Sequence, residues 1–420
     1  MSLQGAGNVL LTDDVIAKEA LRLLKNELVT APLVYRSVEK VFGKVGDTIS
    51  LKKPFRTKTA SGRTLVKQPM VDVTIPFKIN NHEHFGLEIT QRDRTLSLQN
   101  FSERYLKSGI TQLANKIDKS ILDVATTKGF FSSTIAGSAI GTKDLLIAKA
   151  RQTMVGVPDD GLRRAILNPL DGAEISDATS KVFNEAFVKE SIQKGYMGPL
   201  AGYYVFESNN INSYTAGQGW TGTILVAGAN QTGASLNLDG FGTTGSALLK
   251  KGDMFTIAGV YEINPQSYQS TGKLQVFVVT EDANIASGTP NTATVKISPA
   301  INDGSLTTVD AEGTTISLGA YQNVSNKPAD NAPITLIGTA GTAIRQNVLF
   351  HRDAIALAMV DLELPQSAMV KARVRDEDSG LSMSMTGAYD ITNHSEITRI
   401  DCVWGTDVIY GELIHRLLTV

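Results

Sequence analysis

Few residues in this sequence have the types and spacing that chemistry requires. His82-Glu83-His84 most resembles a metal-binding cluster, because two histidines two positions apart share one face of a strand. No third or fourth ligand is evident and the chain has five histidines in all, so a polar strand edge explains the cluster better. Asp376-Glu377-Asp378 could bind a cation, but a solvated charged loop is the simpler interpretation. We therefore predict no metal site and no cofactor.

Catalytic motifs are also lacking. The sequence has no G-x-S-x-G elbow and no Walker-type loop, and Gly240, Gly242 and Gly245 do not precede an apolar helix. The single cysteine, Cys402, alternates within a strand-like run beside Trp404, as a packed thiol does. A triad assembled from distant residues stays open as an alternative. We therefore predict that the protein is not an enzyme.

Charge is concentrated in one basic stretch. Between Lys44 and Lys67 there are seven basic residues and one acid, Asp47, and Ala60-Ser61-Gly62 supplies a turn. A hairpin this basic must project into solvent or lie on a negative surface, and it lacks the aromatic residues, apart from Phe55, that stack on single-stranded nucleic acid. We expect it to pair with acidic patches on neighbouring subunits. The candidate contact residues are Lys52, Lys53, Arg56, Lys58, Arg63 and Lys67.

The elements that position these residues are mixed in type. Helical spacing predicts an amphipathic helix over 13–28, which needs a surface on its own core or on another subunit, and a long helix over 97–127. Shorter helices are expected over 144–155, 178–189 and 353–360. Alternating or buried runs predict strands, which are 47–51, 71–77, 164–167, 203–206, 347–351, 381–385 and 396–404.

Residues 215–343 differ in composition from the rest of the chain. Only 14 of these 129 residues are charged, five basic and nine acidic, and short β-branched runs alternate with Gly, Ser, Thr and Asn. A β-rich block within a chain of mixed α and β texture indicates an inserted domain.

The whole chain is nearly neutral. Its 40 basic and 42 acidic residues give a net charge of -2, which argues against a dedicated nucleic-acid binder. With one cysteine, an intrachain disulfide is impossible. Residues 1–7 lack the regions of a secretion signal, and no apolar run is long enough to span a membrane. We expect synthesis in the cytoplasm and no membrane partner.

Four stretches carry a resemblance to a known family. Lys250 to Val260 resembles the "basic-Gly-Asp, strand, Ala-Gly-Val" stretch of the inserted domain in coat proteins of short-tailed Salmonella phages, and Val295 to Ala300 resembles that domain's strand ending in Pro. Asn347 to Ile355 is similar to the strand and helix that re-enter the host domain. Asp401 to Thr406 is similar to the closing strand and turn. The order of elements resembles the major capsid proteins of tailed phages with the Hong Kong 97-type fold.

This resemblance implies an α+β fold, with an inserted six-stranded all-β barrel, and assigns a part to each segment. The implied parts are an N-terminal arm (1–35), an extended-loop hairpin with flanking strands (36–92), the spine helix of a peripheral domain (93–139), an axial domain (140–215 and 343–370), the inserted barrel (216–342), and closing peripheral strands (371–420). In such relatives a loop of the insertion bridges capsomers. By position it would fall within 226–245, around Asn230, Asn237 and Asp239.

The resemblance also implies a function. Copies would form pentamers and hexamers of an icosahedral shell, assembled in the bacterial cytoplasm on a scaffolding protein and joined to a portal. The procapsid would expand as double-stranded DNA is packaged. Asp13 and Asp14 are the candidate docking residues for a basic scaffold helix. Two rivals remain, namely a cellular nanocompartment shell of the same fold and a β-rich adhesin.

Overall fold

The computed structural model describes most of the chain. The described residues are 13–36, 48–52, 56–59, 62–63, 74–90, 106–135, 139–180, 198–211, 213–309, 315–366, 368, 370–376, 380–391 and 395–419. The chain divides into two compact units. Unit 1 comprises Met1–Ser50, Pro76–Ile121 and Ala356–Asp407, and unit 2 comprises Leu51–Ile75, Leu122–Ile355 and Val408–Val420. Within the described part, no helix has an apolar stretch that could cross a membrane.

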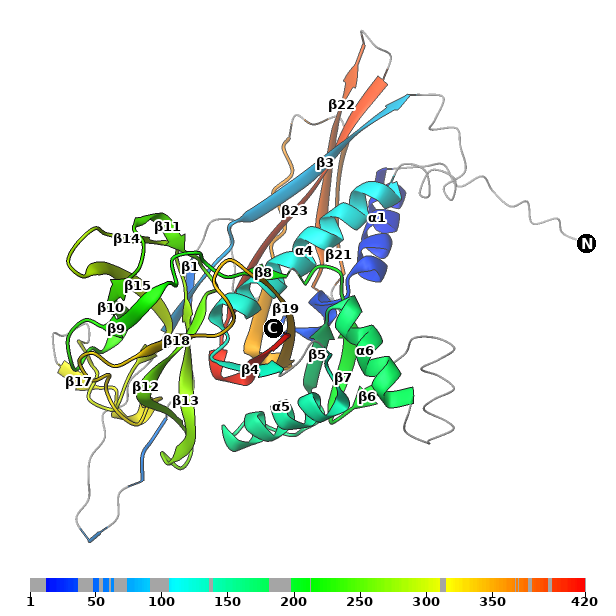
Figure 1. Ribbon diagram of the computed structural model, residues 1–420. Coiled ribbons are helices and arrows are strands. Elements are labelled where there is room, and N and C mark those ends of the chain that lie inside the picture. The colour runs from blue at the N-terminus through cyan, green and yellow to red at the C-terminus, as the bar shows by residue number, and fades with distance from the viewer. Residues whose placement is uncertain are drawn as a thin grey trace, which may run out of the picture. The chain divides into compact units, whose positions relative to one another are not determined.

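Unit 1 is built on a five-stranded sheet whose long strands are easy to follow in Figure 1. The central strand, β23 (Ser395–Val408), pairs antiparallel with β3 (Asn81–Thr90) and with β22 (Ser382–Asp390). β22 also pairs with β21 (Val370–Arg375), and β20 (Ile355–Met359) pairs with β23. The alternating runs at 381–385 and 396–404 are therefore strands, as predicted.

The prediction of a helix over 353–360 is wrong. Arg352–Ala354 forms a single 3-10 turn, η5, and the next five residues form strand β20, all of them buried. The amide of Leu357 donates to the carbonyl of Tyr35 (3.0 Å), and that of Val360 donates to the carbonyl of Val403 (3.2 Å). A short, wholly apolar run has no period that separates a buried strand from a buried helix. The strand conformation of this segment therefore depends on its hydrogen bonds to neighbouring backbone groups.

The N-terminal helix lies on its own unit. α1 (Asp13–Glu27) packs against β21 and β22 and buries Ile16, Ala20 and Leu24. The 3-10 turn η1 (Ala31–Leu33) follows, and the buried carboxylate of Asp118 accepts hydrogen bonds from the backbone amides of residues 29–31 at 2.8, 3.0 and 3.2 Å. The amphipathic stripe is thus covered by the chain's own core.

The long helix is confirmed over the part that the structure describes. α4 (Lys107–Lys128) follows the predicted stripe, which is buried at Leu106, Ile110, Leu113, Ile117 and Ile121. Residues 97–105 lie outside the described residues. The indole Nε1 of Trp404 on β23 donates to Ser120 Oγ on α4 at 2.9 Å, which ties the helix to the unit 1 sheet.

Unit 2 contains a seven-stranded sheet, whose strands run in the order β4 (Phe131–Ile135), β24 (Ile414–Thr419), β19 (Ala343–His351), β5 (Arg163–Leu167), β7 (Tyr203–Glu207) and β6 (Pro199–Leu200), with β8 (Tyr214–Thr215) beside β19. Helices α5 (Thr142–Met154) and α6 (Pro169–Ser180) belong to the same unit. Of the helix expected over 178–189, the structure describes residues 178–180, which are the end of α6, and α6 begins earlier than expected, at Pro169. The last strand, β24, lies in this sheet and not with β21–β23.

The extended hairpin is described at its base. β1 (Thr48–Lys52) and β2 (Thr74–Lys78) form a two-stranded sheet. This pairing confirms that the strand-like runs flanking the basic stretch meet.

The β-rich segment (residues 216–342) contains a second sheet in unit 2. Its strand order is β18 (Ile334–Leu336), β12 (Met254–Ile263), β13 (Ser270–Val279), β15 (Asn291–Ile301), β10 (Gly233–Phe241) and β9 (Gly222–Val226). Two small sheets pair β11 (Gly245–Leu249) with β14 (Ala283–Ile285), and β16 (Thr307–Val309) with β17 (Thr315–Ser317), which precedes the 3-10 turn η4 (Gly319–Tyr321).

The two ends of the six-stranded sheet meet. The amide of Val226 on β9 donates to the carbonyl of Ala332 (3.1 Å), and the amide of Asn331, just before β18, donates to the carbonyl of Val226 (3.0 Å). The side chains within form one core that includes Trp220, Phe255 and Phe277. The segment therefore has a hydrophobic core of its own.

The β-rich segment leaves and rejoins the seven-stranded sheet at one place. β8, which precedes it, pairs with β19, which follows it, through Thr215 opposite Ala343 and Tyr214 opposite Ile344. The amide of Ala216 donates to the carbonyl of Thr342 at 3.2 Å, and the amide of Gly341 donates to the carbonyl of Ala216 at 3.1 Å. Entry and exit are thus hydrogen-bonded neighbours.

Candidate functional site

The structure describes four of the six candidate residues of the basic stretch. Lys52 ends β1, Arg63 is exposed, and Arg56 and Lys58 lie in the described segment 56–59. Lys53 and Lys67 lie outside the described residues. Arg56 and Lys58 carry the clearest contacts, and both contacts lie within unit 2, which includes Leu51–Ile75.

Arg56 and Lys58 are held by an acid and two tyrosines. The Arg56 guanidinium forms an ion pair with Glu412 in the 3-10 turn η6 (Gly411–Leu413), and it lies 5.8 Å from the ring centroid of Tyr321. The Lys58 ammonium lies 4.6 Å from the ring centroid of Tyr268. Cation–π contacts of this kind are attractive within about 6 Å. Arg56, one of the six candidate residues, therefore has an acidic partner within the chain, Glu412.

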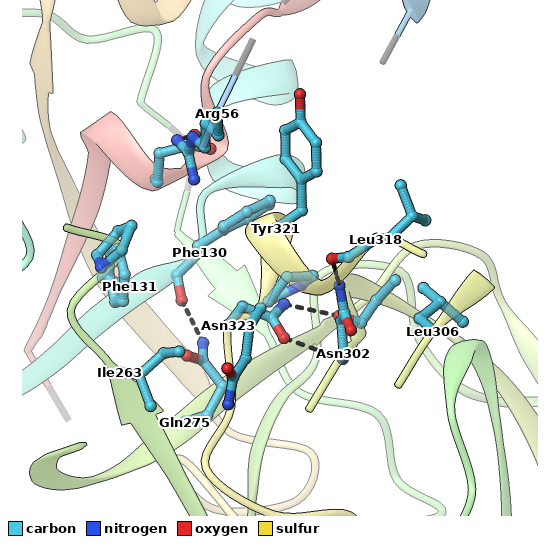
Figure 2. A pocket seen from close by; sticks show the side chains of 15 residues that line it. Arg56, Phe130, Phe131, Ile263, Gln275, Asn302, Leu306, Leu318, Tyr321 and Asn323 are labelled. Carbon is cyan, nitrogen blue, oxygen red and sulfur yellow. Dashed lines mark hydrogen bonds and ion pairs between the residues drawn. The ribbon is translucent and has the colours of Figure 1, made fainter. Parts of the chain in front are cut away.

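A cavity of about 250 Å³ adjoins this contact (Figure 2). Arg56, Tyr321 and Glu412 line it, together with apolar side chains that include Phe130 and Leu318. Two asparagines fix its wall: Asn302 Nδ2 donates to the Leu318 carbonyl at 3.0 Å, and the Asn302 amide donates to Asn323 Oδ1 at 3.0 Å. The cavity has a preformed apolar wall and a charged rim.

A buried carboxylate organises the junction of the β-rich segment. Asp253 Oδ1 accepts hydrogen bonds from the Tyr214 hydroxyl and the Gly217 amide (2.9 Å), and Oδ2 accepts from Trp220 Nε1 (2.5 Å) and the Lys250 amide (2.7 Å). Burial raises the pKa of Asp253 to about 6, although the amides of Gly217 and Lys250 act in the opposite direction. Four donors around one carboxylate favour its ionised form at neutral pH.

The Lys250-Lys251-Gly252-Asp253 motif is the turn that carries this carboxylate. Gly252 has φ +97°, a backbone conformation that favours glycine. The Asp253 amide donates to the Lys250 carbonyl at 3.0 Å, and Asp282 accepts from the Lys251 amide at 2.8 Å and from Lys250 Nζ at 2.9 Å. The residues that carried the family resemblance thus build the junction.

A second buried network joins the β-rich segment to α5 and the seven-stranded sheet. Arg151 Nη2 on α5 lies 3.0 Å from Glu262 Oε2 on β12, and their side chains are 9 % and 1 % exposed. Arg151 Nη1 also donates to Ser133 Oγ (3.3 Å), which lies 2.9 Å from His415 Nε2 on β24. Thr271 Oγ1 donates to Glu262 Oε1 at 2.8 Å. Five side chains from four strands and one helix form one connected network.

This network holds His415 neutral. Burial, followed by the charges of Arg151 and Lys273, lowers the pKa of His415 well below its usual 6.5. The unfolded chain binds a proton near pH 6.5 and the folded chain does not, so stability should be lost as pH falls below about 6.5. The size is up to about 1.4 kcal/mol per pH unit below that value. The measurement is the free energy of unfolding from pH 5 to 8 for the wild type and His415→Gln, and the variant should lose the part of the slope that His415 contributes. Equal slopes in the two proteins would contradict it.

The three candidate residues for contacts between capsomers do not share one loop. Asn230 lies in the turn between β9 and β10 with φ +62°, and its amide donates to the Pro328 carbonyl at 2.9 Å. Asn237 lies on strand β10 between the buried residues Leu236 and Leu238, and Asp239 follows Leu238 on the same strand. A loop does lie within the expected range 226–245, between β9 and β10, but Asn230 is the one candidate residue of the three that belongs to it. The alternation of Leu236 and Leu238 with polar residues was the strand signal.

Two residues considered as metal or cation ligands, His82 and Asp376, have partners within the protein. His82 Nε2 lies 2.8 Å from Asp401 Oδ1, and Lys25 Nζ lies 2.7 Å from Asp376 Oδ2. Over the described ranges, no three His, Cys, Asp or Glu side chains group as a metal site would require. Burial raises the pKa of Cys402 to about 12, so its thiol is unreactive at neutral pH.

For the arm, the structure describes Asp13 and Asp14 as the first residues of α1. Asp14 is exposed. The residues that sequence reasoning missed are Glu412, Tyr268, Tyr321, Arg151 and Glu262. None belongs to a local motif, and each acquires its partner only when distant segments fold together.

Comparison with known proteins gives one family over nearly the whole chain. The family model described as "P22 coat protein - gene protein 5" matches residues 14–415. No curated protein matches the chain.

Similar solved structures include three of different origin. A chain of Mycobacterium phage Che8 is 16% identical, with 93% of this chain and 90% of that chain covered and a TM-score of 0.45. The CUS-3 coat protein I-domain is 29% identical, with 29% of this chain and 100% of that chain covered and a TM-score of 0.19. A virus-like particle from Pyrococcus furiosus is 7% identical, with 96% and 97% covered and a TM-score of 0.40.

Proposed function

Because the chain belongs to the P22 coat protein family, it is a major capsid protein, and we propose that it is closest to the short-tailed Salmonella phage coat proteins that carry an insertion domain. As a capsid protein it is structural and non-enzymatic, and its copies assemble into the icosahedral head shell of a bacteriophage. The match of the family model over residues 14–415 carries this conclusion. It favours a phage shell over a cellular nanocompartment or an adhesin.

The β-rich segment is, in this proposal, an inserted six-stranded barrel domain. Three observations support it: the hydrogen-bonded entry and exit at Ala216 and Thr342, the separate hydrophobic core, and the hydrogen bonds of Val226 that join the sheet's two ends. The domain stabilises the subunit and contributes contacts between capsomers through Asn230, Asn237 and Asp239. Two of these, Asn230 and Asn237, are exposed.

The remaining parts of the proposal follow the expected division of the chain. The arm would be 1–35, with Asp13 and Asp14 docking a scaffolding protein, and 36–92 would carry the loop toward neighbouring subunits. The axial domain would be 140–215 and 343–370, and residues 371–420 would add peripheral strands. The partners would be a scaffolding protein, a portal and packaged double-stranded DNA bound without sequence specificity. Assembly would take place in the host cytoplasm, followed by procapsid expansion.

Electron microscopy of the expressed protein tests the shell function. We expect closed shells or capsomer rings, because closed heterologous contacts between identical copies build such assemblies.

The variant that carries both Asp13→Lys and Asp14→Lys, expressed in the same way, tests scaffold docking. If the scaffold is a basic helix, the reversal should abolish scaffold-dependent assembly. A small monodisperse species with and without scaffold would contradict the shell function, whereas unchanged scaffold dependence would contradict only the arm's role.

A further inference from the structure

A buried cation in the seven-stranded sheet lacks an acidic partner. Arg416 on β24 is 1 % exposed, and its Nη2 donates to Gln346 Oε1 on β19 at 2.8 Å. The Nε and Nη1 atoms of Arg416 are buried and have no acceptor among the described residues. Burial lowers the pKa of Arg416 to about 9, so the side chain still carries its charge at neutral pH. A buried charge without a counter-charge is strongly unfavourable, and this favours the binding of an anion.

The cross-strand neighbour of Arg416 is a second buried donor. Ser132 on β4 pairs with Arg416 in the parallel register of β4 and β24, so the two side chains share one face of the sheet, on strands about 5 Å apart. The Ser132 hydroxyl is also buried and has no hydrogen-bond partner in the described part of the chain. Because buried polar groups are nearly always hydrogen-bonded, two unpartnered neighbours on one face indicate a shared acceptor that is not part of the protein.

The other neighbours on this face bring no charge. On β19 the residue paired with Arg416 is Val348, and on β24 Leu418 lies on the same face two residues further along. Leu418 packs in an apolar cluster with Met254 and Val278 of the β-rich segment. Apolar surroundings screen charge poorly, so an anion here would be held more strongly than one at the protein surface.

Two buried acids near this sheet already pair with other cations. Asp171 accepts from Thr419 Oγ1, which lies on the opposite face of β24, and one Asp171 oxygen lies 3.0 Å from Arg345 Nη1. Glu262 lies 3.0 Å from Arg151. In the ranges that the structure describes, no carboxylate forms an ion pair with the guanidinium on β24. Its counter-charge must therefore come from a bound ion.

We propose that Arg416 and Ser132 bind a small monovalent inorganic anion, such as chloride, inside unit 2. The anion accepts hydrogen bonds from the guanidinium and from the Ser132 hydroxyl, and the charge-assisted bonds are the stronger ones. One negative charge neutralises the one cation, whereas a divalent anion would leave a buried charge of its own. Arg416, Ser132 and Gln346 are 1 %, 3 % and 7 % exposed, so a large organic anion does not reach them.

Chloride is the probe, and urea unfolding of the full-length chain is the readout. An anion that binds only the folded chain raises the folding equilibrium constant, and between about 1 mM and about 300 mM chloride we expect a rise of about tenfold or more. Sodium gluconate, whose anion is too large for the site, keeps the ionic strength constant throughout the titration. Urea is preferred because guanidinium chloride would itself supply the anion.

Three variants locate the effect. Arg416→Met should abolish the dependence on chloride, and it should still fold because an apolar side chain of similar length replaces a buried charge. Ser132→Ala removes one donor and should raise the chloride concentration for half of the effect about threefold or more. Arg352→Met is the matched control, because the Arg352 side chain is 46% exposed, and it should keep the wild-type dependence.

Each other outcome overturns the proposal. Equal chloride dependence in the wild type, Arg416→Met and Arg352→Met would mean adventitious ions at the surface only. A wild type whose stability does not change over this range of chloride would have no such site. Ser132→Ala keeps the test decisive even if Arg416→Met folds poorly, because an unchanged affinity for chloride in Ser132→Ala would contradict a site shared by the two side chains.

Discussion

Replacing Asp253 by asparagine should cause one of the two largest losses of stability expected for a single polar substitution in the β-rich segment. An amide has one acceptor oxygen, so its NH₂ group would face two of the four donors that now surround the carboxylate. Each buried donor left without a partner costs about 1–3 kcal/mol, which gives a loss of about 3 kcal/mol or more. Because the site is buried, the donors that lose their acceptor would have no replacement partner in the protein.

The indole of Trp220 makes the effect directly observable. It donates to Asp253, and the chain has only one other tryptophan, Trp404, which belongs to unit 1. In a Trp404→Phe background, fluorescence during urea unfolding therefore reports the environment of the carboxylate. Asp253→Asn should shift the midpoint to lower urea.

A nearby acid provides the matched control. Asp282 pairs with Lys250 at 2.9 Å, but both side chains are nearly half exposed. Asp282→Asn should cost less than about 1 kcal/mol, as exposed pairs do. Equal midpoints for Asp253→Asn and Asp282→Asn would show that the buried network contributes nothing special.

Elements with a strong period could be predicted from the sequence. The stripe of α4 repeats every three or four residues, and β23 alternates over a long run, so local pattern and final structure agree. Residues 355–359 had no such period. Their strand conformation depends on the hydrogen bond of Leu357 to Tyr35 and on the pairing of β20 with β23, and both partners are distant in sequence.

Only the basic partner of the candidate site could be predicted from the sequence. The excess of cations between Lys44 and Lys67 indicated that the stretch needs an acidic partner. The partner found for Arg56, Glu412, is separated from it by 356 residues, and nothing local marks that glutamate. The composition of the stretch indicates that its positive charges need acidic partners, but only the folded chain brings Glu412 to Arg56.

The junction shows an intermediate case. Gly252 followed by Asp253 is a recognisable turn signal, and the resemblance drew attention to it. The four donors come from Tyr214, Gly217, Trp220 and Lys250, which lie up to 39 residues from Asp253. The turn could be predicted, but the burial that makes its carboxylate important could not.

The second large effect is expected at the buried ion pair between Arg151 and Glu262. Glu262→Gln leaves the Arg151 cation buried without its counter-charge, and breaking one side of such a pair costs about 3–5 kcal/mol. Removing the cation as well, in Arg151→Met with Glu262→Gln, should recover part of that loss. The free energies of unfolding of the two single variants and the double variant therefore measure the coupling directly.

The same helix offers the control, and the network offers an independent readout. Lys149→Met removes a partly exposed pair with Asp159 and should cost less than about 1 kcal/mol. Because the charge of Arg151 helps to lower the pKa of His415, Arg151→Met should raise that pKa, whereas Lys149→Met should leave it unchanged. Additive losses from Arg151→Met and Glu262→Gln, with an unchanged His415 titration by NMR, would mean that α5 and the β-rich segment are held together by packing alone.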